Sequence, residues 1–232
     1  MIQPKNEKEL MLSAAILAGR TLGEIANRQG IVVPRDLKRA KGWVGELFES
    51  ALGASAGSRP VPDFEDLGIE LKSIPLNTRH EPQESTFVSS APLQNTIGLR
   101  WINSAVKAKL SRVLWVPVEA AHRIPVAQRR VGRPFIWSPS SQDSAILQAD
   151  WEEHIERIAL GDLDELDGRL GTYLQIRPKA INRRDRTIAT SSQGEPINTL
   201  PRGFYLRTSF TRKIVTHASH QEITWDPKPS ID

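Results

Sequence analysis

The residues with the clearest capacity for chemistry lie in one short stretch, where Asp63 is followed by Glu70 and Lys72. We expect residues 67–76 to form a strand, which would place Glu70 and Lys72 on one face because strand side chains alternate. Asp63 would return to that face from the preceding turn. Neighbouring carboxylates repel each other unless a cation lies between them, and Mg²⁺ takes carboxylate, water and phosphate oxygens as ligands. A nearby lysine can orient the attacking water or neutralise charge on a phosphate, so the spacing is typical of a metal-dependent phosphodiesterase.

The same residues also have a purely structural interpretation. A glutamate and a lysine two positions apart on a strand commonly form an ion pair on a solvated face. Glu49 is similarly open to two interpretations, since it lies among apolar residues of an expected amphipathic helix over residues 41–52. It can be a rim residue with its carboxylate in water, or a further acid of the site. The motif alone does not decide between these possibilities.

Periodicity and capping signals predict the elements that would position these residues. We expect helices at residues 7–19, 21–28 (opened by a Thr21–Glu24 capping box), 41–52, 101–111 and 142–160, with a further helix start at Pro34 and Asp36. Strands are expected at residues 67–76, 85–91, 112–118, 135–137, 173–177 and 203–210. Residues 53–60 and 77–84 are expected to be loops, and residues 181–199 a mobile loop.

These elements predict a mixed α/β protein, with helices packed on a central sheet and the acids at one edge of a cleft. We expect residues 1–232 to form a single domain made of two lobes, with residues 217–232 as a flexible tail. Most of the six tryptophans are expected in the core, because each buries a large area.

Composition narrows the class of protein. The 232 residues contain 39% hydrophobic and 25% charged residues, as in ordinary globular proteins, and no cysteine, which excludes disulfides and thiolate metal sites. No signal peptide or membrane span is expected, so the predicted location is the cytoplasm. Two basic tracts, residues 106–133 and 177–213, flank an acidic tract at residues 142–168. The basic tracts can meet a polyanion, or can simply be solvated surface.

Seven segments of the chain carry a resemblance to a known family. They are residues 41–45 (KGWVG), 52–60 (LGASAGSRP), 67–75 (LGIELKSIP), 112–119 (RVLWVPVE), 124–132 (IPVAQRRVG), 173–180 (YLQIRPKA) and 200–206 (LPRGFYL). Together they resemble the MutH DNA mismatch-repair endonucleases, in register from about residue 7 to about residue 215. The resemblance is far more specific than the acid–lysine spacing.

The resemblance implies a fold, an activity and partners. The implied fold is that of type II restriction endonucleases, a central mixed sheet flanked by helices with two lobes around a DNA-binding cleft. The implied enzyme uses Mg²⁺, although Mn²⁺ or Ca²⁺ can occupy the site, and is activated by the mismatch-repair ATPase MutL. It nicks the unmethylated strand 5′ of the G in hemimethylated GATC sites of double-stranded DNA. A monomer associated with the nucleoid, and no membrane, is expected.

The resemblance also implies a role for particular residues. Asp63, Glu70 and Glu49 would bind the metal, Lys72 would be the catalytic lysine, and Lys41 and Lys109 would support it near the scissile phosphate. Arg177, Pro178, Lys179, Tyr205 and Phe87 would contact DNA, with Arg177 on a base edge and Tyr205 sensing adenine methylation. Each of these has a plainer alternative, since Arg177 can bind only phosphate, and Phe87 and Tyr205 can be core.

Two other functions remain open from the sequence. One is a dimeric, GATC-specific restriction endonuclease of the same fold that cuts both strands. The other is a catalytically silent module that senses methylation and binds DNA. The joint presence of Asp63, Glu70 and Lys72 argues against the silent module.

Overall fold

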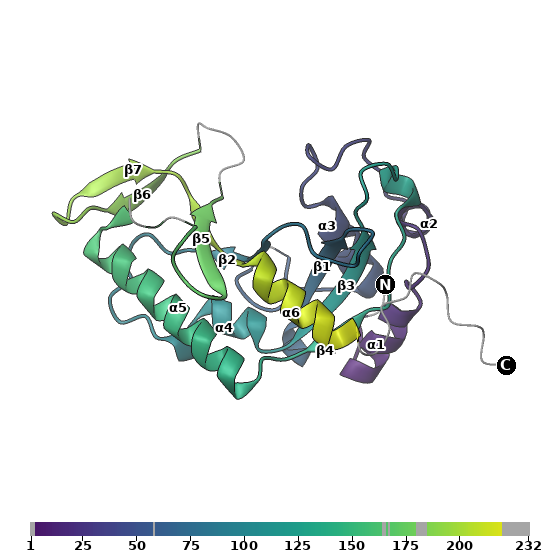
Figure 1. The fold of residues 1–232 in the computed structure, drawn as a ribbon, viewed down its shortest axis with the longest axis horizontal. Coiled ribbons are helices and arrows are strands. Elements are labelled where there is room, and N and C mark those ends of the chain that lie inside the picture. The colour runs from purple at the N-terminus through teal and green to yellow at the C-terminus, as the bar shows by residue number, and fades with distance from the viewer. Residues whose placement is uncertain (1–2, 58, 164–165, 167, 180–184, 220–232) are drawn as a thin grey trace. The chain divides into compact units, whose positions relative to one another are not determined.

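The computed structural model describes residues 3–57, 59–163, 166, 168–179 and 185–219 (Figure 1). The chain divides into two compact units. The first unit consists of Met1–Gln83, Arg112–Ser138 and Arg212–Asp232, and the second unit of Glu84–Ser111 and Pro139–Thr211. Each unit has its own sheet, so the catalytic and the DNA-contacting candidates can be placed on separate frameworks.

Among the described residues, the first unit combines helices with a three-stranded sheet. Its elements are α1 (Glu7–Ala15), α2 (Leu22–Gln29), α3 (Trp43–Leu52), η1 (Glu65–Leu67), β1 (Glu70–Leu76), β3 (Val113–Glu119), η3 (Val126–Gln128) and β4 (Phe135–Trp137). The strand order is β1-β3-β4, with β1 parallel to β3 and β3 antiparallel to β4. The predicted capping box is confirmed, because the side chains and backbones of Thr21 and Glu24 bond each other reciprocally at the start of α2.

The core of the first unit explains which way β1 faces. Ile69 and Leu71 are buried in one cluster with Leu10, Leu22 and Phe48 from the helices. Because side chains alternate along a strand, Glu70 and Lys72 point to the opposite face of the sheet. The predicted assignment of the two faces is therefore confirmed at this end of β1.

The second unit combines an antiparallel sheet with a long helix. Its elements are β2 (Thr86–Ser90), η2 (Trp101–Asn103), α4 (Ala105–Leu110), α5 (Ser141–Leu160), β5 (Leu174–Pro178), β6 (Thr187–Thr190), β7 (Pro196–Thr199) and β8 (Arg202–Leu206). The main sheet has the order β2-β8-β5, and β6 pairs with β7 in a separate hairpin. The helix α6 (Thr208–Ser219) begins in the second unit and ends in the first.

Asp150 ties α5 to the start of β5. Its carboxylate is 5% exposed and accepts backbone hydrogen bonds from Thr172, Tyr173 and Leu174 at 2.8, 2.6 and 2.8 Å. A carboxylate that accepts several N–H groups forms strong, charge-assisted hydrogen bonds. The position of β5, which carries Arg177, is thus set by a residue of the helix behind it.

The mixed α/β class is confirmed, and the strands are shared among several small sheets. Some local expectations are wrong. No helix begins at Pro34, because the Asp36 side chain accepts the Lys38 N–H at 2.8 Å and closes a turn instead. The expected strand at residues 67–76 begins only at Glu70, because η1 precedes it and Gly68 has a φ of +63°.

Three further differences lie in the second half of the chain. The expected strand at residues 203–210 ends at Leu206, where the chain turns into α6. The expected loop at residues 181–199 contains the β6–β7 hairpin, while residues 181–184 lie outside the described residues. Of the expected tail at residues 217–232, residues 217–219 belong to α6 and the others are outside the described residues.

No helix in the described part of the chain is long and apolar enough to cross a membrane.

Candidate functional site

A tight turn places the Asp63 carboxylate beside β1. Phe64 and Ile69 bond each other's backbones at 2.9 and 3.2 Å, so the chain folds back over η1. Asp63 is 8% exposed, and its Oδ2 accepts the N–H of Leu71 at 2.8 Å. Leu71 separates Glu70 from Lys72, so this bond aligns Asp63 with both. The structure therefore brings the predicted triad together.

Glu70 and Lys72 form an ion pair on their shared face of β1. Lys72 Nζ lies 2.5 Å from Glu70 Oε1, and the side chains are 14% and 1% exposed, respectively. This is not the solvated surface pair that the structural interpretation expected. A carboxylate this buried has lost most of its water, which is unfavourable unless cations or hydrogen-bond donors replace it. Glu70 therefore lies in a site that favours positive charge.

Glu49 on α3 is the third candidate acid, and it is partly buried. We call Asp63, Glu70 and Glu49 the acid cluster. Burial raises the pKa of its carboxyl above the ordinary value, and the charges of Asp63, Glu46 and Glu70 raise it further, whereas Lys72 lowers it. The direction of this change is the one expected for a carboxyl group that lies near other acids. Glu49 is therefore neither fully buried nor in open water, and its role as a further acid of the site stays a prediction.

A polar pocket of about 490 Å³ opens beside Glu49 within the first unit. Its lining includes Gln3, Glu46, Ser50 and Ser55. The loop after α3 lines part of the pocket and is bonded to Asp63, because the N–H groups of Ser55 and Ala56 donate to the backbone oxygen of Asp63. A small polar ligand or hydrated ion can therefore approach Glu49 from this side.

The donor set suits a hard divalent cation. Asp63, Glu70 and Glu49 offer only carboxylate oxygens, the ligands that Mg²⁺ prefers. Within the described residues, no group of three acidic, histidine or cysteine side chains is close enough to form a complete metal site. Mg²⁺ does not require one, since it is usually bound through one or two carboxylates with water and phosphate oxygens. The residues present fit such an ion.

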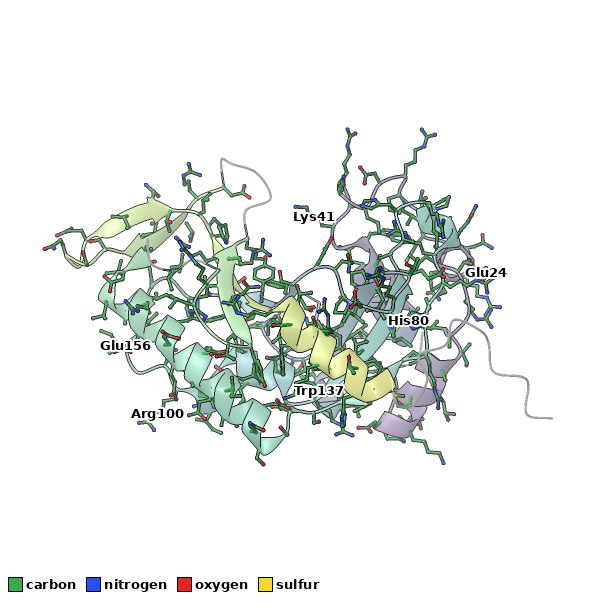
Figure 2. The ribbon with its side chains drawn as sticks, in the orientation of Figure 1. Glu24, Lys41, His80, Arg100, Trp137 and Glu156 are labelled. Atoms are coloured by element: carbon green, nitrogen blue, oxygen red, sulfur yellow. The ribbon has the colours of Figure 1, made fainter. Side chains whose placement is uncertain are left out.

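The two supporting lysines lie in different units. Lys41 is an exposed residue in the turn before α3, labelled in Figure 2. Lys109 is a partly buried residue in the last turn of α4, in the second unit. The supporting role of both lysines stays a prediction.

Four of the five predicted DNA-contacting residues gather on one face of the second unit's sheet. Phe87 and Tyr205 are paired across β2 and β8, with their rings 5.3 Å apart in an edge-to-face arrangement. Arg177 lies over the Tyr205 ring at 5.9 Å, and Lys179 over the Phe87 ring at 4.3 Å. Both distances fall within the range of cation–π contacts. The four residues form what we call the cation–aromatic cluster.

A β-bulge at Val88 determines which side chains of β2 lie on this face. The register shifts between Phe87, opposite Tyr205, and Ser89, opposite Phe204. Without the extra residue, Phe87 and Ser89 would share a face. With it, Phe87 lies partly exposed beside Tyr205, while Ser89 turns to the buried face. The expectation that Phe87 and Tyr205 can be ordinary core residues is not met, since both are only partly buried.

Burial changes the chemistry of two members of the cluster. It lowers the pKa of the Lys179 ammonium below its ordinary value. It raises the pKa of the Tyr205 hydroxyl, although the charge of Arg177 opposes that change. Tyr205 is therefore a neutral hydrogen-bonding group at physiological pH. Pro178 is exposed at the end of β5, but it follows Arg177 directly and so faces the other side of the sheet.

Gly203 is a structural residue of the cluster that the sequence did not reveal. A Cβ there would lie 2.8 Å from Phe87 Cε2 and 3.2 Å from the Ser89 oxygen. The Phe87 ring can lie over β8 only because residue 203 has no side chain. Ser85 and Ser90, which bond Arg177 and Lys179, were also missed, and nothing in their spacing marks them.

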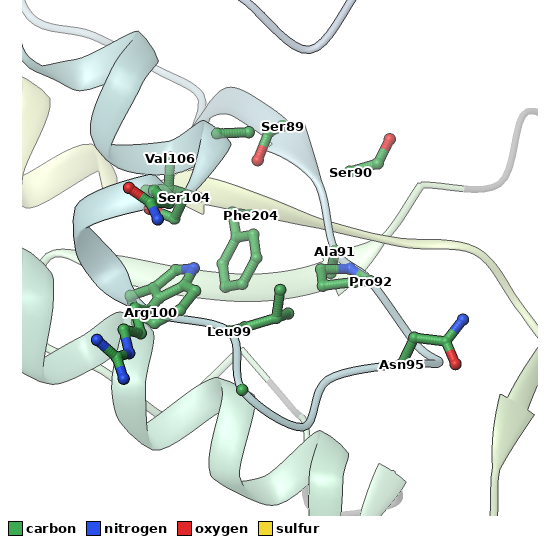
Figure 3. A pocket seen from close by; sticks show the side chains of 14 residues that line it. Ser89, Ser90, Ala91, Pro92, Asn95, Leu99, Arg100, Ser104, Val106 and Phe204 are labelled. Carbon is green, nitrogen blue, oxygen red and sulfur yellow. The ribbon is translucent and has the colours of Figure 1, made fainter.

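A separate pocket of about 810 Å³ lies on the other face of this sheet (Figure 3). Its lining includes Ser89, Pro92, Leu99, Arg100, Trp151 and Phe204. None of the predicted site residues lines it. Phe204 and Tyr205 are adjacent on β8 and so face opposite ways, with Phe204 toward this pocket and Tyr205 toward the cation–aromatic cluster. Ser90 lines the pocket and also accepts a hydrogen bond from Lys179.

Comparison with known proteins identifies the family. The model of the family "DNA mismatch repair enzyme MutH" matches residues 52–150. The DNA mismatch repair protein MutH of Vibrio campbellii is 55% identical over 213 residues, covering 92% of this chain and 94% of the relative. The chain belongs to the MutH family. MutH proteins of Serratia proteamaculans and Shewanella baltica are each 52% identical, covering 90% and 93% of this chain and 91% and 96% of the relatives.

The family match bears differently on the two clusters. The segment that the MutH family model covers includes Asp63, Glu70 and Lys72, together with Phe87 and Lys109. The resemblance of the chain to MutH endonucleases is thereby confirmed. Glu49 and the cation–aromatic residues of β5 and β8 lie outside that segment, and their assignment to a site stays a prediction.

Proposed function

We propose that this chain is a DNA mismatch-repair endonuclease that hydrolyses a phosphodiester bond with the help of a divalent cation. The observation that carries the proposal is the buried Glu70–Lys72 pair with Asp63 fixed beside it, in a member of the MutH family. The relatives' names indicate a role in DNA mismatch repair, and the arrangement of Asp63, Glu70 and Lys72 suits phosphodiester hydrolysis. The proposal rests on both observations together.

Asp63 and Glu70 would hold the cation, with Glu49 as the further acid. When bound, Mg²⁺ would lower the pKa of a water and offset charge on the phosphate. Lys72, beside Glu70, would orient the attacking water and stabilise the negative charge that develops on the phosphate oxygens. The water forms the new P–O bond while the bond to the 3′ oxygen breaks, leaving a nick. Lys41 and Lys109 would neutralise nearby phosphates.

The cation–aromatic cluster would select the site. A guanidinium such as that of Arg177 is suited to guanine O6 and N7 in the major groove. Lys179 would bind backbone or base as a point charge, Pro178 would make apolar contacts, and Phe87 would contact bases. Tyr205 would distinguish adenine from N6-methyladenine by fit, because the methyl group adds bulk and removes a donor orientation. The proposed target is hemimethylated GATC, cut on the unmethylated strand.

The proposal extends to partners and state. We expect activation by MutL, action as a monomer on double-stranded DNA, and a cytoplasmic location at the nucleoid. Nicking of one strand needs only one active site, which suits a monomer. A dimeric restriction enzyme would instead cut both strands, and a silent module would bind without cutting.

The test is a nicking assay on circular plasmids carrying one GATC site in unmethylated, hemimethylated or fully methylated form. Each plasmid is incubated with Mg²⁺ or EDTA, with and without MutL and ATP. We expect Mg²⁺-dependent nicks confined to the unmethylated strand and stimulated by MutL. Glu70→Ala should abolish nicking while DNA binding persists. Asp66→Asn is a matched control, since Asp66 is an exposed acid in the same turn.

The other outcomes each point elsewhere. Double-strand cleavage without MutL would favour the restriction enzyme. Binding without cleavage under every condition would favour the silent module. Full activity in Glu70→Ala would reject the assigned metal site, whatever the specificity of the protein.

A further inference from the structure

The two cationic side chains of the cation–aromatic cluster are both anchored to the far strand of the sheet. Because the strand order is β2-β8-β5, Arg177 on β5 must cross β8 to reach β2. Its Nη1 donates to Ser85 Oγ at 2.7 Å, one residue before β2 begins. On the way, the guanidinium passes over the ring of Tyr205. The guanidinium of Arg177 is thus in contact with both the Tyr205 ring and the Ser85 hydroxyl.

Lys179 follows the same path two residues further along the chain. Its Nζ donates to Ser90 Oγ at 3.1 Å, at the other end of β2, and lies over the Phe87 ring. Ser85 and Ser90 therefore lie at the two ends of β2, and each serine hydroxyl accepts a hydrogen bond from one cationic side chain. Neither serine belongs to the acid cluster or was expected to contact DNA.

We propose that Ser85 is a positioning residue for base recognition, which fixes the plane of the Arg177 guanidinium before DNA binds. This inference rests on the proposed function, because it takes Arg177 as the residue that contacts a base edge. Ser85 occupies only one of the guanidinium's several donors, so others can serve a bidentate contact. The serine can therefore orient the guanidinium while leaving other N–H donors of Arg177 available to the base.

The physical advantage of such an anchor is pre-organisation. A free arginine side chain samples many rotamers, and ordering it on binding costs conformational entropy. Bidentate recognition also needs the guanidinium plane aligned with the base pair, and a tilted plane loses one of the two hydrogen bonds. The Ser85 bond and the Tyr205 ring remove part of this cost in the unbound protein.

Ser90 provides an internal comparison. An ammonium is a compact point charge with rotatable donors, so its exact direction matters less than that of a guanidinium. Loss of the Ser90 bond should weaken binding of all DNA sequences alike. Loss of the Ser85 bond should instead reduce discrimination between GATC and its variants. Comparing the two serine variants therefore distinguishes an effect on DNA affinity from an effect on sequence specificity.

The experiment compares kcat/KM on duplex oligonucleotides containing GATC or one altered base pair, using full-length protein with Mg²⁺. The variants are Ser85→Ala, Ser85→Thr, Ser90→Ala, Arg177→Ala and the Ser85→Ala/Arg177→Ala double variant. We expect Ser85→Ala to lower the discrimination ratio about threefold to tenfold, the range expected for one lost hydrogen bond. Ser85→Thr, which keeps the hydroxyl, should restore it. Melting temperatures should stay unchanged.

The double variant supplies the decisive result. If Ser85 acts through Arg177, then Ser85→Ala should have no further effect on discrimination once Arg177 is alanine. Additive losses, or an unchanged ratio in Ser85→Ala alone, would overturn the positioning role while leaving Arg177 as the reader. An unchanged ratio in Arg177→Ala would instead reject Arg177 as a reader, and the proposal of specific recognition by this residue with it.

Discussion

Asp63 Oδ2 accepts a 2.8 Å hydrogen bond from the backbone N–H of Leu71, the residue between Glu70 and Lys72. The bond joins a turn residue to a strand backbone, so the carboxylate cannot drift relative to its two partners. Active sites need this kind of fixed geometry, because small displacements of catalytic groups are costly in rate. The acid–lysine arrangement is therefore built into β1 and does not depend on a flexible loop.

Lys72→Met should remove cleavage while leaving DNA binding largely intact. Methionine keeps the apolar stem but not the ammonium beside Glu70, so the phosphate would lose a donor positioned for its developing charge. Loss of one such donor lowers the rate about 100-fold to 1,000-fold. Single-turnover nicking and equilibrium DNA binding measured side by side would check this. Lys8→Met, an exposed change on α1, is the control and should be silent.

Metal binding should tighten with rising pH because of Glu49. Its pKa is raised by burial and by Asp63, Glu46 and Glu70, so a proton is retained to higher pH than usual in the metal-free protein. A cation must displace that proton. Below the raised pKa binding releases a proton and is weaker, and above it this competition is lost.

Glu49→Gln should flatten the pH dependence of metal affinity. Calorimetric Mg²⁺ titrations in buffers of different ionisation enthalpy would count the protons released. The same variant should slightly stabilise the metal-free protein at neutral pH, by less than about 1 kcal/mol, since it removes repulsion. A wild-type affinity that is constant from acidic to neutral pH would contradict the assignment of Glu49 to the metal site.

Much of this site could be predicted from the sequence because its signals are local. The alternation of Ile69, Glu70, Leu71 and Lys72 along one strand fixes their faces whatever the rest of the fold does. The capping box at Thr21 is local in the same way. In contrast, the hairpin over residues 187–199 is polar and lacks alternation, so its pairing depends on backbone bonds that composition does not reveal.

The features that were missed depend on contacts between distant residues. The bulge at Val88 is visible only when β2 is paired with β8. Ser85 bonds Arg177 across 92 positions of sequence. Gly203 resembles any other loop-adjacent glycine until the Phe87 ring is seen above it. Such residues shape the site without belonging to a recognisable motif.

Asp150→Ala should strongly destabilise the second unit. The change leaves backbone N–H groups of Thr172, Tyr173 and Leu174 without their carboxylate, at a position that is 5% exposed. Each unsatisfied buried donor costs about 1–3 kcal/mol, and only Leu174 of the three is buried, so we expect a loss of about 1–3 kcal/mol. Urea unfolding would measure it. Glu156→Ala, an exposed change on the same helix (Figure 2), should cost less than about 0.5 kcal/mol.

Gly203→Ala should weaken DNA binding by displacing Phe87 and not by unfolding the protein. The new Cβ would meet Phe87 Cε2 at 2.8 Å, so the ring must move away from Tyr205 and Lys179. Edge-to-face and cation–π contacts are each worth about 0.5–1.5 kcal/mol, which corresponds to a loss of affinity of roughly threefold to tenfold. Fluorescence anisotropy with labelled GATC duplexes would measure the change.

The Phe87→Ala background tests whether the ring carries this effect. With no ring to displace, Gly203→Ala should have little further effect on affinity, apart from a small adjustment around the Ser89 oxygen at 3.2 Å. The double variant should therefore bind DNA about as well as Phe87→Ala alone. If Gly203→Ala weakens binding equally with and without the Phe87 ring, then strain in β8 and not the aromatic contact is responsible, and the glycine has no role in the cluster.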